Sequence, residues 1–117
     1  FDETLGVGAG TVWGAAEGTD YLLRSLRLGF KLKFLADMTL HHPVKTAHFD
    51  AGACLRQKKY ETGIGRVMRI NDYPFWYFPV TCLRTCGGIA LALARGDFLK
   101  ARFKYVSVLA RVRGWRG

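Results

Sequence analysis

A run of mostly apolar side chains, PFWYFPVTCLRTCGGIALALA at residues 74–94, is the feature that most constrains how this chain can fold. Its length approaches the roughly 20 apolar residues that a helix needs to cross a lipid bilayer. Pro79 and Arg84 interrupt the run and leave two shorter apolar pieces. Pieces of that length suit an interfacial or re-entrant segment better than a membrane span. We therefore expect residues 74–116 to hold the protein on a membrane surface without crossing it.

The charge of the chain is concentrated in its second part. The net charge is +9; residues 44–117 carry fourteen Lys and Arg against four Asp and Glu, whereas residues 1–43 carry four against five. The tail at residues 97–115, DFLKARFKYVSVLARVRGW, alternates apolar with basic residues and would form a basic amphipathic helix. This asymmetry indicates an anionic membrane surface or another polyanion as partner, and a solvated basic face is the alternative.

The first part of the chain predicts a mixed α/β structure. Residues 1–16 are rich in glycine and read as a loop, and a helix is expected near residues 19–28. The segment FKLKFL at residues 30–35 alternates apolar and basic side chains, which predicts a strand with one buried face. A second short extended piece, MTLHH, is expected at residues 38–42, and mostly helix from Lys45 onward.

Two acids and two histidines are the candidates for chemistry. Glu17 and Asp20 lie at the start of the predicted helix, where unpaired amides stabilise carboxylates, and that is the structural explanation. The functional explanation is a general base behind a glycine loop that closes over a substrate. Asp20 and Arg24 are spaced to form an ion pair. His42 could join a metal site, although histidines that cap or pack are the commoner case.

Residues 1–43 resemble the second half of the catalytic domain of family 2 glycosyltransferases, which have the GT-A fold. The resemblance rests on an FDE loop with glycines, an acidic motif that opens a helix with LLR, a glycine after that helix, and a closing HP. The matching residues are Phe1, Asp2, Glu3, Leu5, Gly6, Gly8, Glu17, Thr19, Asp20, Leu22, Leu23, Arg24, Gly29, His42 and Pro43. The resemblance implies a fragment of a larger enzyme, with residues 1–43 as the acceptor-side part of the GT-A domain and residues 44–117 as a helical, basic, membrane-associating extension.

The resemblance also implies an activity and a set of site residues. The parent would transfer a sugar from a nucleotide-sugar donor to a hydroxyl of a glycan or lipid-linked acceptor, in cell-envelope polysaccharide synthesis at the cytoplasmic face of the membrane. A divalent metal, Mg or Mn, would offset charge on the leaving diphosphate. The implied roles are catalytic for Glu17 and Asp20, substrate-binding for Gly8, Gly10, Trp13 and Arg24, and metal-binding for His42.

Two departures from the family pattern bear on this activity. Gly18 stands where the family has the second acid of its acidic pair, and the chain contains no Asp-x-Asp motif. We therefore expect the fragment alone to be inactive.

Two further function classes remain open. The first is a non-catalytic basic membrane-surface module, anchored by aromatic residues such as Trp76, Tyr77 and Trp115 and by attraction to anionic lipid. The second, nucleic-acid binding, ranks last because the aromatic residues lie in an apolar run rather than between basic residues on short strands.

Overall fold

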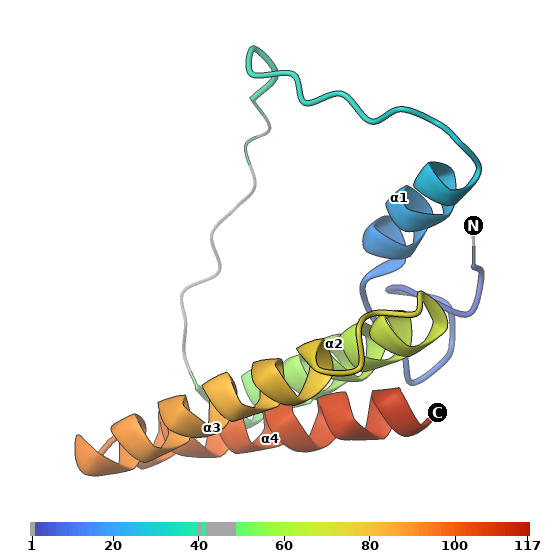
Figure 1. Ribbon diagram of the computed structural model, residues 1–117. Helices are drawn as coiled ribbons and strands as arrows, with labels where there is room; N and C mark the ends of the chain where they lie inside the picture. Colours follow the sequence, from blue (N-terminus) through green and yellow to red (C-terminus); the bar gives the residue numbers. More distant parts are fainter. Residues whose placement is uncertain (1, 40, 42–48) are drawn as a thin grey trace.

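The computed structural model describes residues 2–39, 41 and 49–117, and the secondary structure of these residues is entirely helical (Figure 1). Four helices follow one another along the chain: α1 (Glu17–Arg27), α2 (Ala51–Ile70), α3 (Tyr77–Ala94) and α4 (Phe98–Arg116). The predicted α/β class, a partial GT-A domain followed by a helical extension, is therefore wrong. Its helical second part is matched by α2, α3 and α4, and the helix predicted near residues 19–28 exists but begins earlier, at Glu17.

The two segments predicted as strands have no neighbouring strand to pair with among the described residues. Residues 30–35 lie outside any helix or strand. A strand is stabilised by the ladder it forms with a neighbour. Phe30, Leu32 and Phe34 are exposed, so the alternating pattern buries no face here. Residues 38, 39 and 41 of the second predicted segment also lie outside any helix or strand, while Leu40 and His42 fall outside the described residues.

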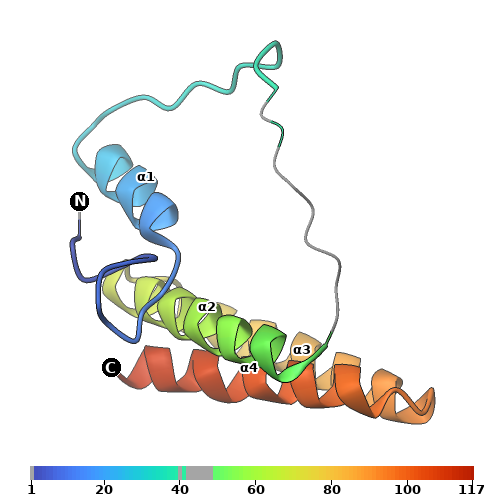
Figure 2. The same ribbon diagram turned by 180° about the vertical axis from the view of Figure 1, so that it is seen from behind.

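Helix α4 is the centre of the packed part of the molecule. Helices α2 and α3 both lie along it, as the views from the two sides agree (Figures 1 and 2). Helices α2 and α4 run parallel: Phe49, just before α2, contacts Phe103 with ring centroids 5.1 Å apart, and Glu61 pairs further along with Arg111. Helix α3 runs antiparallel to both, because a short turn at residues 95–97 joins it to α4.

Small residues allow α2 and α4 to approach closely. A Cβ on Gly65 would collide with the backbone carbonyl of Arg111, and a Cβ on Gly114 would collide with that of Thr62. The buried residues of α4 are correspondingly small: Ala101, Ser107, Ala110 and Gly114. Helices that lack large side chains at their contact can bring their backbones together, the arrangement known from Gly-xxx-Gly pairs.

Two aspartates fix the starts of the helices in this unit. The Asp50 carboxylate accepts a hydrogen bond from the Ala53 amide at 2.6 Å, and that of Asp97 accepts one from the Lys100 amide at 3.0 Å. Such caps satisfy amides that have no partner within the helix. Asp97 therefore sets the point at which the chain turns from α3 into α4.

Candidate functional site

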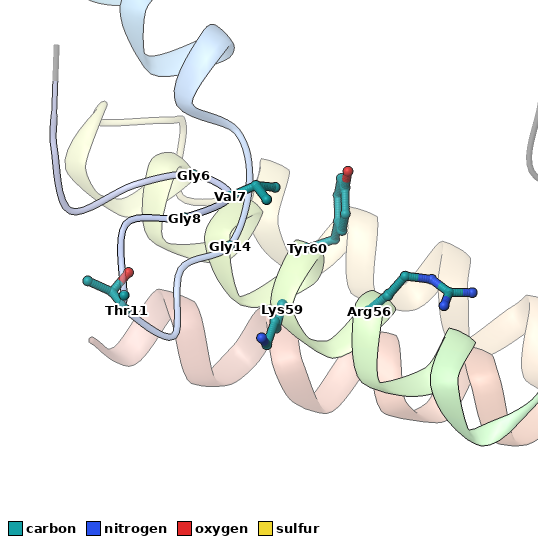
Figure 3. Close-up of a pocket in the computed structure, with 9 residues that line it drawn as sticks. Gly6, Val7, Gly8, Thr11, Gly14, Arg56, Lys59 and Tyr60 are labelled. Carbon is teal, nitrogen blue, oxygen red and sulfur yellow. The ribbon is translucent and has the colours of Figure 1, made fainter. Parts of the chain in front are cut away.

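The glycine-rich loop before α1 folds against α2 and encloses a cavity of about 540 Å³ (Figure 3). The Gly6 amide donates to the Trp13 carbonyl at 2.8 Å and closes the loop, and Gly14 lies against the Cβ of Lys59. The loop contributes Gly6, Val7, Gly8, Gly10, Thr11 and Gly14 to the lining, and α2 contributes Arg56, Lys59 and Tyr60. Figure 3 shows the Arg56 side chain pointing away from the loop, whereas the Lys59 side chain lies beside the loop at Gly14.

Only some of the residues predicted to bind substrate line this cavity. Gly8 and Gly10 line the loop cavity, but Trp13 does not. The Trp13 ring instead stacks on the Arg66 guanidinium, whose carbon lies 4.7 Å from the ring centroid, a cation–π contact that holds the loop on α2. Arg56, Lys59 and Tyr60 were missed from the sequence, since only the docking of the loop on α2 brings them to the cavity.

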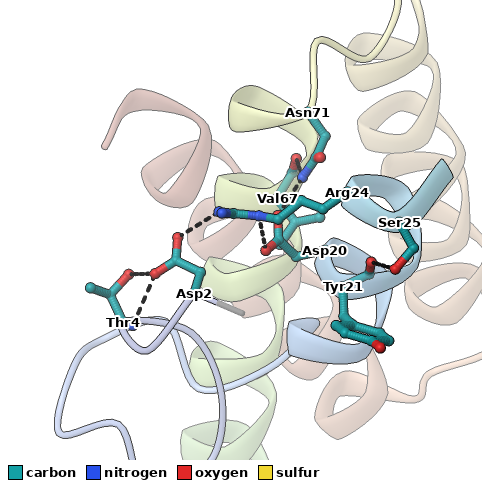
Figure 4. Close-up of polar contacts among 8 residues, drawn as sticks. All are labelled: Asp2, Thr4, Asp20, Tyr21, Arg24, Ser25, Val67 and Asn71. Atoms are coloured by element: carbon teal, nitrogen blue, oxygen red, sulfur yellow. Dashed lines mark hydrogen bonds and ion pairs between the residues drawn. The ribbon is translucent and has the colours of Figure 1, made fainter. Parts of the chain in front are cut away.

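Asp20 lies in a buried polar cluster between α1 and the end of α2 (Figure 4). Its side chain is 1% exposed, Oδ1 accepts a hydrogen bond from Asn71 Nδ2 at 2.8 Å, and Oδ2 lies 2.7 Å from Arg24 Nε. The ion pair expected between Asp20 and Arg24 is thus present. Arg24 Nε is close to Asp20 Oδ2 but is not aligned with it as a hydrogen bond. Attraction between the two charges therefore offsets the cost of burying this oxygen.

The other side of the Arg24 guanidinium also has a partner. Its Nη2 donates to Asp2 Oδ2 at 3.2 Å, and the Thr4 hydroxyl and amide both donate to Asp2 Oδ1. The hydrogen bonds from Thr4, and then the nearby Arg24 charge, lower the pKa of the Asp2 carboxyl below its ordinary value of 3.8. Arg24 therefore joins the N-terminal loop to α1, and its guanidinium is bound to protein carboxylates rather than turned to an open cavity.

The predicted acids do not meet at the loop cavity. Glu17 opens α1 with its carboxyl group against Gly6, close enough that a Cβ on Gly6 would lie 2.9 Å from Glu17 Cδ. Neither Glu17 nor Asp20 lines the cavity, although a general base must come within hydrogen-bond reach of the proton it removes. The contacts of Asp20 give it a structural role, because they hold α1 against the end of α2.

The predicted metal ligand, His42, lies outside the described residues. Within residues 2–39, 41 and 49–117, no group of three or more His, Cys, Asp or Glu side chains is placed to hold a metal ion. The acids that the structure does bring near one another, Asp2 and Asp20, are bridged by Arg24.

The face formed by α3 and α4 is the second candidate surface. Helix α3 is long and apolar enough to cross a membrane by length and composition, which alone is weak evidence, and only Ala92 of its residues is buried. Large apolar side chains on the two helices are therefore open to solvent: Val80, Leu83, Leu91 and Leu93 on α3, and Phe98, Leu99, Tyr105 and Leu109 on α4.

The exposed side of α4 mixes apolar and basic side chains. Apart from Leu99, its exposed residues recur at intervals of three and four: Phe98, Arg102, Tyr105, Leu109, Arg113 and Arg116. Positions with that spacing share one face of a helix. The face therefore mixes aromatic and aliphatic groups with arginines. Apolar and basic side chains are not separated onto opposite sides of α4, so the predicted basic amphipathic helix is wrong in this respect.

Comparison with known proteins adds no relative: no family model matches the chain, and neither a curated protein nor a solved structure does. The resemblance to family 2 glycosyltransferases is thus not supported, because the described residues contain four helices and no strand and no family model bears it out. The short motifs that carried the resemblance are degenerate. Asp20 and Arg24, for example, are explained by an ion pair that packs α1.

Proposed function

We propose that this chain is a membrane-surface binding module in which the α3–α4 hairpin lies on an anionic lipid leaflet. The observation that carries the proposal is the exposure of α3, an apolar helix with a single buried residue, Ala92, in the part of the chain that the structure describes. Leu83, near its middle, is 68% exposed. Burial of apolar surface yields about 25 cal/mol per Å², and this protein buries little of the surface of α3 against itself.

The packing of α4 on α3 favours a surface pose over a membrane span. The two helices lie side by side, so an α3 that crossed the bilayer would draw α4 with it or lose its contacts with α4. Helix α4 carries Lys100, Arg102 and Lys104 along that length, in addition to Arg111, which is paired with Glu61. Each such charge costs about 2.5–3.5 kcal/mol at the centre of a bilayer on insertion scales. At the surface, an exposed side chain such as that of Arg102 extends its charged end toward lipid phosphates while its stem covers apolar groups.

Charge and aromatic residues support an anionic leaflet as the partner. Near such a leaflet each Lys or Arg contributes about 1 kcal/mol. Phe75 and Trp76, which precede α3, are exposed and have the character of side chains that anchor at the headgroup level. Because anionic lipids are enriched on the cytoplasmic leaflet, we place the module at the cytoplasmic face of the cell membrane.

Sugar transfer, the activity that the sequence resemblance implied, is the weaker candidate. It would need a nucleotide-sugar donor, an acceptor and a divalent metal, and no contact among the described residues argues for any of them. Nucleic-acid binding ranks below the membrane proposal, since the exposed apolar side chains of α3 would gain nothing from a polyanion in water.

Co-sedimentation with vesicles tests the proposal. The chain should bind phosphatidylcholine vesicles that contain phosphatidylglycerol, bind pure phosphatidylcholine far less, and be released by high salt. Replacing Arg102, Arg113 and Arg116 on the exposed face of α4 by glutamine removes about 3 kcal/mol of attraction, so the partition coefficient should fall about 100-fold.

A matched control removes the same charge elsewhere. Arg56, Lys58 and Lys59 are exposed on α2, and their replacement by glutamine should weaken binding less than fivefold if the surface on α3 and α4 is the one in contact. Equal losses in the two triple variants would assign binding to net charge alone. Failure of the unmodified chain to bind the anionic vesicles would refute the proposal.

A further inference from the structure

A second cavity, of about 350 Å³, lies where α2, α3 and α4 meet. Helix α2 lines it with Ile64 and Met68, α3 with Thr81, Arg84 and Thr85, and α4 with Lys104 and Arg111. Three basic side chains from two helices thus border one cavity. Such an arrangement costs electrostatic free energy unless anions offset the charge.

One of the three basic side chains is already paired. Arg111 donates from Nε to Glu61 Oε2 at 2.8 Å, and its Nη2 lies 2.8 Å from the same oxygen. The two side chains are only 11% and 8% exposed, and Arg111 Nη1 reaches Thr85 Oγ1 at 3.4 Å on α3. Arg111 is therefore a fixed wall of the cavity whose charge Glu61 balances.

The other two basic side chains have no acidic partner within the part of the chain that the structure describes. Neither Arg84 nor Lys104 takes part in an ion pair there, and no unpaired carboxylate lines the cavity. Lys104 is half-buried, and its ammonium lies against α3 at Gly88, where an added Cβ would come within 2.9 Å of Nζ. The absence of a side chain at Gly88 thus lets the Lys104 ammonium settle between the two helices.

The remaining polar groups narrow the chemistry of a ligand. The Thr81 hydroxyl donates to the Phe78 carbonyl at 2.7 Å and that of Thr85 to the Thr81 carbonyl at 3.0 Å, so both protons are used within α3. The groups left to bind a ligand are therefore the Arg84 guanidinium and the Lys104 ammonium. A phosphate group matches this pair, because arginine binds its oxygens in a fork and lysine acts as a point charge.

We propose that this cavity binds the phosphate group of an anionic ligand through direct contacts with Arg84 and Lys104. Two positive charges balance the dianion of a phosphate monoester, and Ile64 and Met68 offer an apolar wall to the group esterified to it. The phosphate belongs either to a lipid headgroup or to a soluble ester. The lipid case rests on the membrane proposal above; phosphate binding by the cavity does not.

Titration with glycerol 3-phosphate, followed by NMR chemical shifts of the full chain, tests the site itself. The shifts should saturate and should centre on the amides of residues 81–85 and 104. Arg84→Gln and Lys104→Gln should each weaken glycerol 3-phosphate binding by about 10- to 100-fold, the range for a lost hydrogen bond to a charged group. Arg102→Gln is the matched control: it removes a charge from the exposed face of α4, away from the cavity, and should change the affinity less than twofold.

Vesicles of equal surface charge distinguish the two sources of phosphate. If the ligand is a lipid, the chain should prefer phosphatidylcholine vesicles doped with phosphatidic acid, a monoester, over those doped with phosphatidylglycerol, and Lys104→Gln should abolish the preference. Binding of glycerol 3-phosphate without any vesicle binding would support the cavity with a soluble ester and refute the membrane proposal instead. No saturable shift, or an equal loss in Arg102→Gln, would overturn the cavity proposal, provided that circular dichroism shows unchanged helicity in each variant.

Discussion

Single residues in this chain are placed by partners that lie far away in the sequence. Asp20 is the clearest case: at the start of a helix it is an ordinary stabilising acid, but in the structure its carboxylate is 1% exposed and meets Asn71 of α2 as well as Arg24. Its spacing from Arg24 predicted the ion pair, whereas nothing local to α1 indicates Asn71.

Removal of the Asp20 carboxylate should therefore destabilise the fold. Asp20→Ala leaves the Arg24 charge with only Asp2 as partner and takes one acceptor from the buried Asn71 amide. We expect the free energy of unfolding to fall by about 1–3 kcal/mol, the usual cost of a lost partner in a buried polar cluster. Urea denaturation followed by circular dichroism measures it, with the exposed Asp37→Ala as the control, which should stay within about 0.5 kcal/mol. Equal stability of the two variants would contradict a structural role for Asp20.

At the scale of helices, the contact of α2 with α4 depends on glycines. Gly114→Ala would push a Cβ into the Thr62 carbonyl, and backbone cannot move aside as a flexible side chain does. We expect this variant to lose about 1–3 kcal/mol of stability or more, as overpacked cores do. The matched control is Gly87→Ala on α3, where an added Cβ meets nothing within 4 Å; better helix propensity should leave it as stable or up to about 1 kcal/mol more stable. A Gly114→Ala variant as stable as Gly87→Ala would contradict the close contact of α2 with α4.

The sequence predicts the helices of this chain better than it predicts which segments pack or pair with one another. The apolar spacing near residues 19–28 and the helical character after Lys45 correspond to α1, α2, α3 and α4. The alternation at residues 30–35 describes how a strand would sit in a sheet, but it does not reveal whether a second strand is present. Gly8 and Gly10, which were predicted to bind substrate, line the loop cavity, while Arg56 and Lys59 join it only through docking of the loop on α2.

The molecule as a whole buries little of its large apolar surface. Its buried apolar residues are mostly Ala, and Leu5, Val67 and Met68 are the only larger aliphatic side chains among those described. The radius of gyration is 15.8 Å, against about 13 Å for a compact chain of this length. On the proposal above, a bundle with an exposed apolar helix beside a basic one would gain stability from an environment that is apolar on one side and anionic on the other. A membrane surface is such an environment.

The depth of Cys86 in a bilayer tests this account most directly. Cys86 is exposed near the middle of α3, so a nitroxide can be attached there after Cys54 and Cys82 are replaced by alanine. Electron paramagnetic resonance with oxygen and a nickel chelate then reports the depth of the label in anionic vesicles. A surface pose places it about 5–10 Å below the phosphates, and a label on Leu93→Cys, built in a variant in which Cys86 is also replaced by alanine, should lie at a similar depth because the helix is parallel to the membrane. A label at Cys86 about 15 Å deep, at the middle of the hydrocarbon, together with a shallow one at Leu93→Cys, would show that α3 spans the bilayer and would contradict the account.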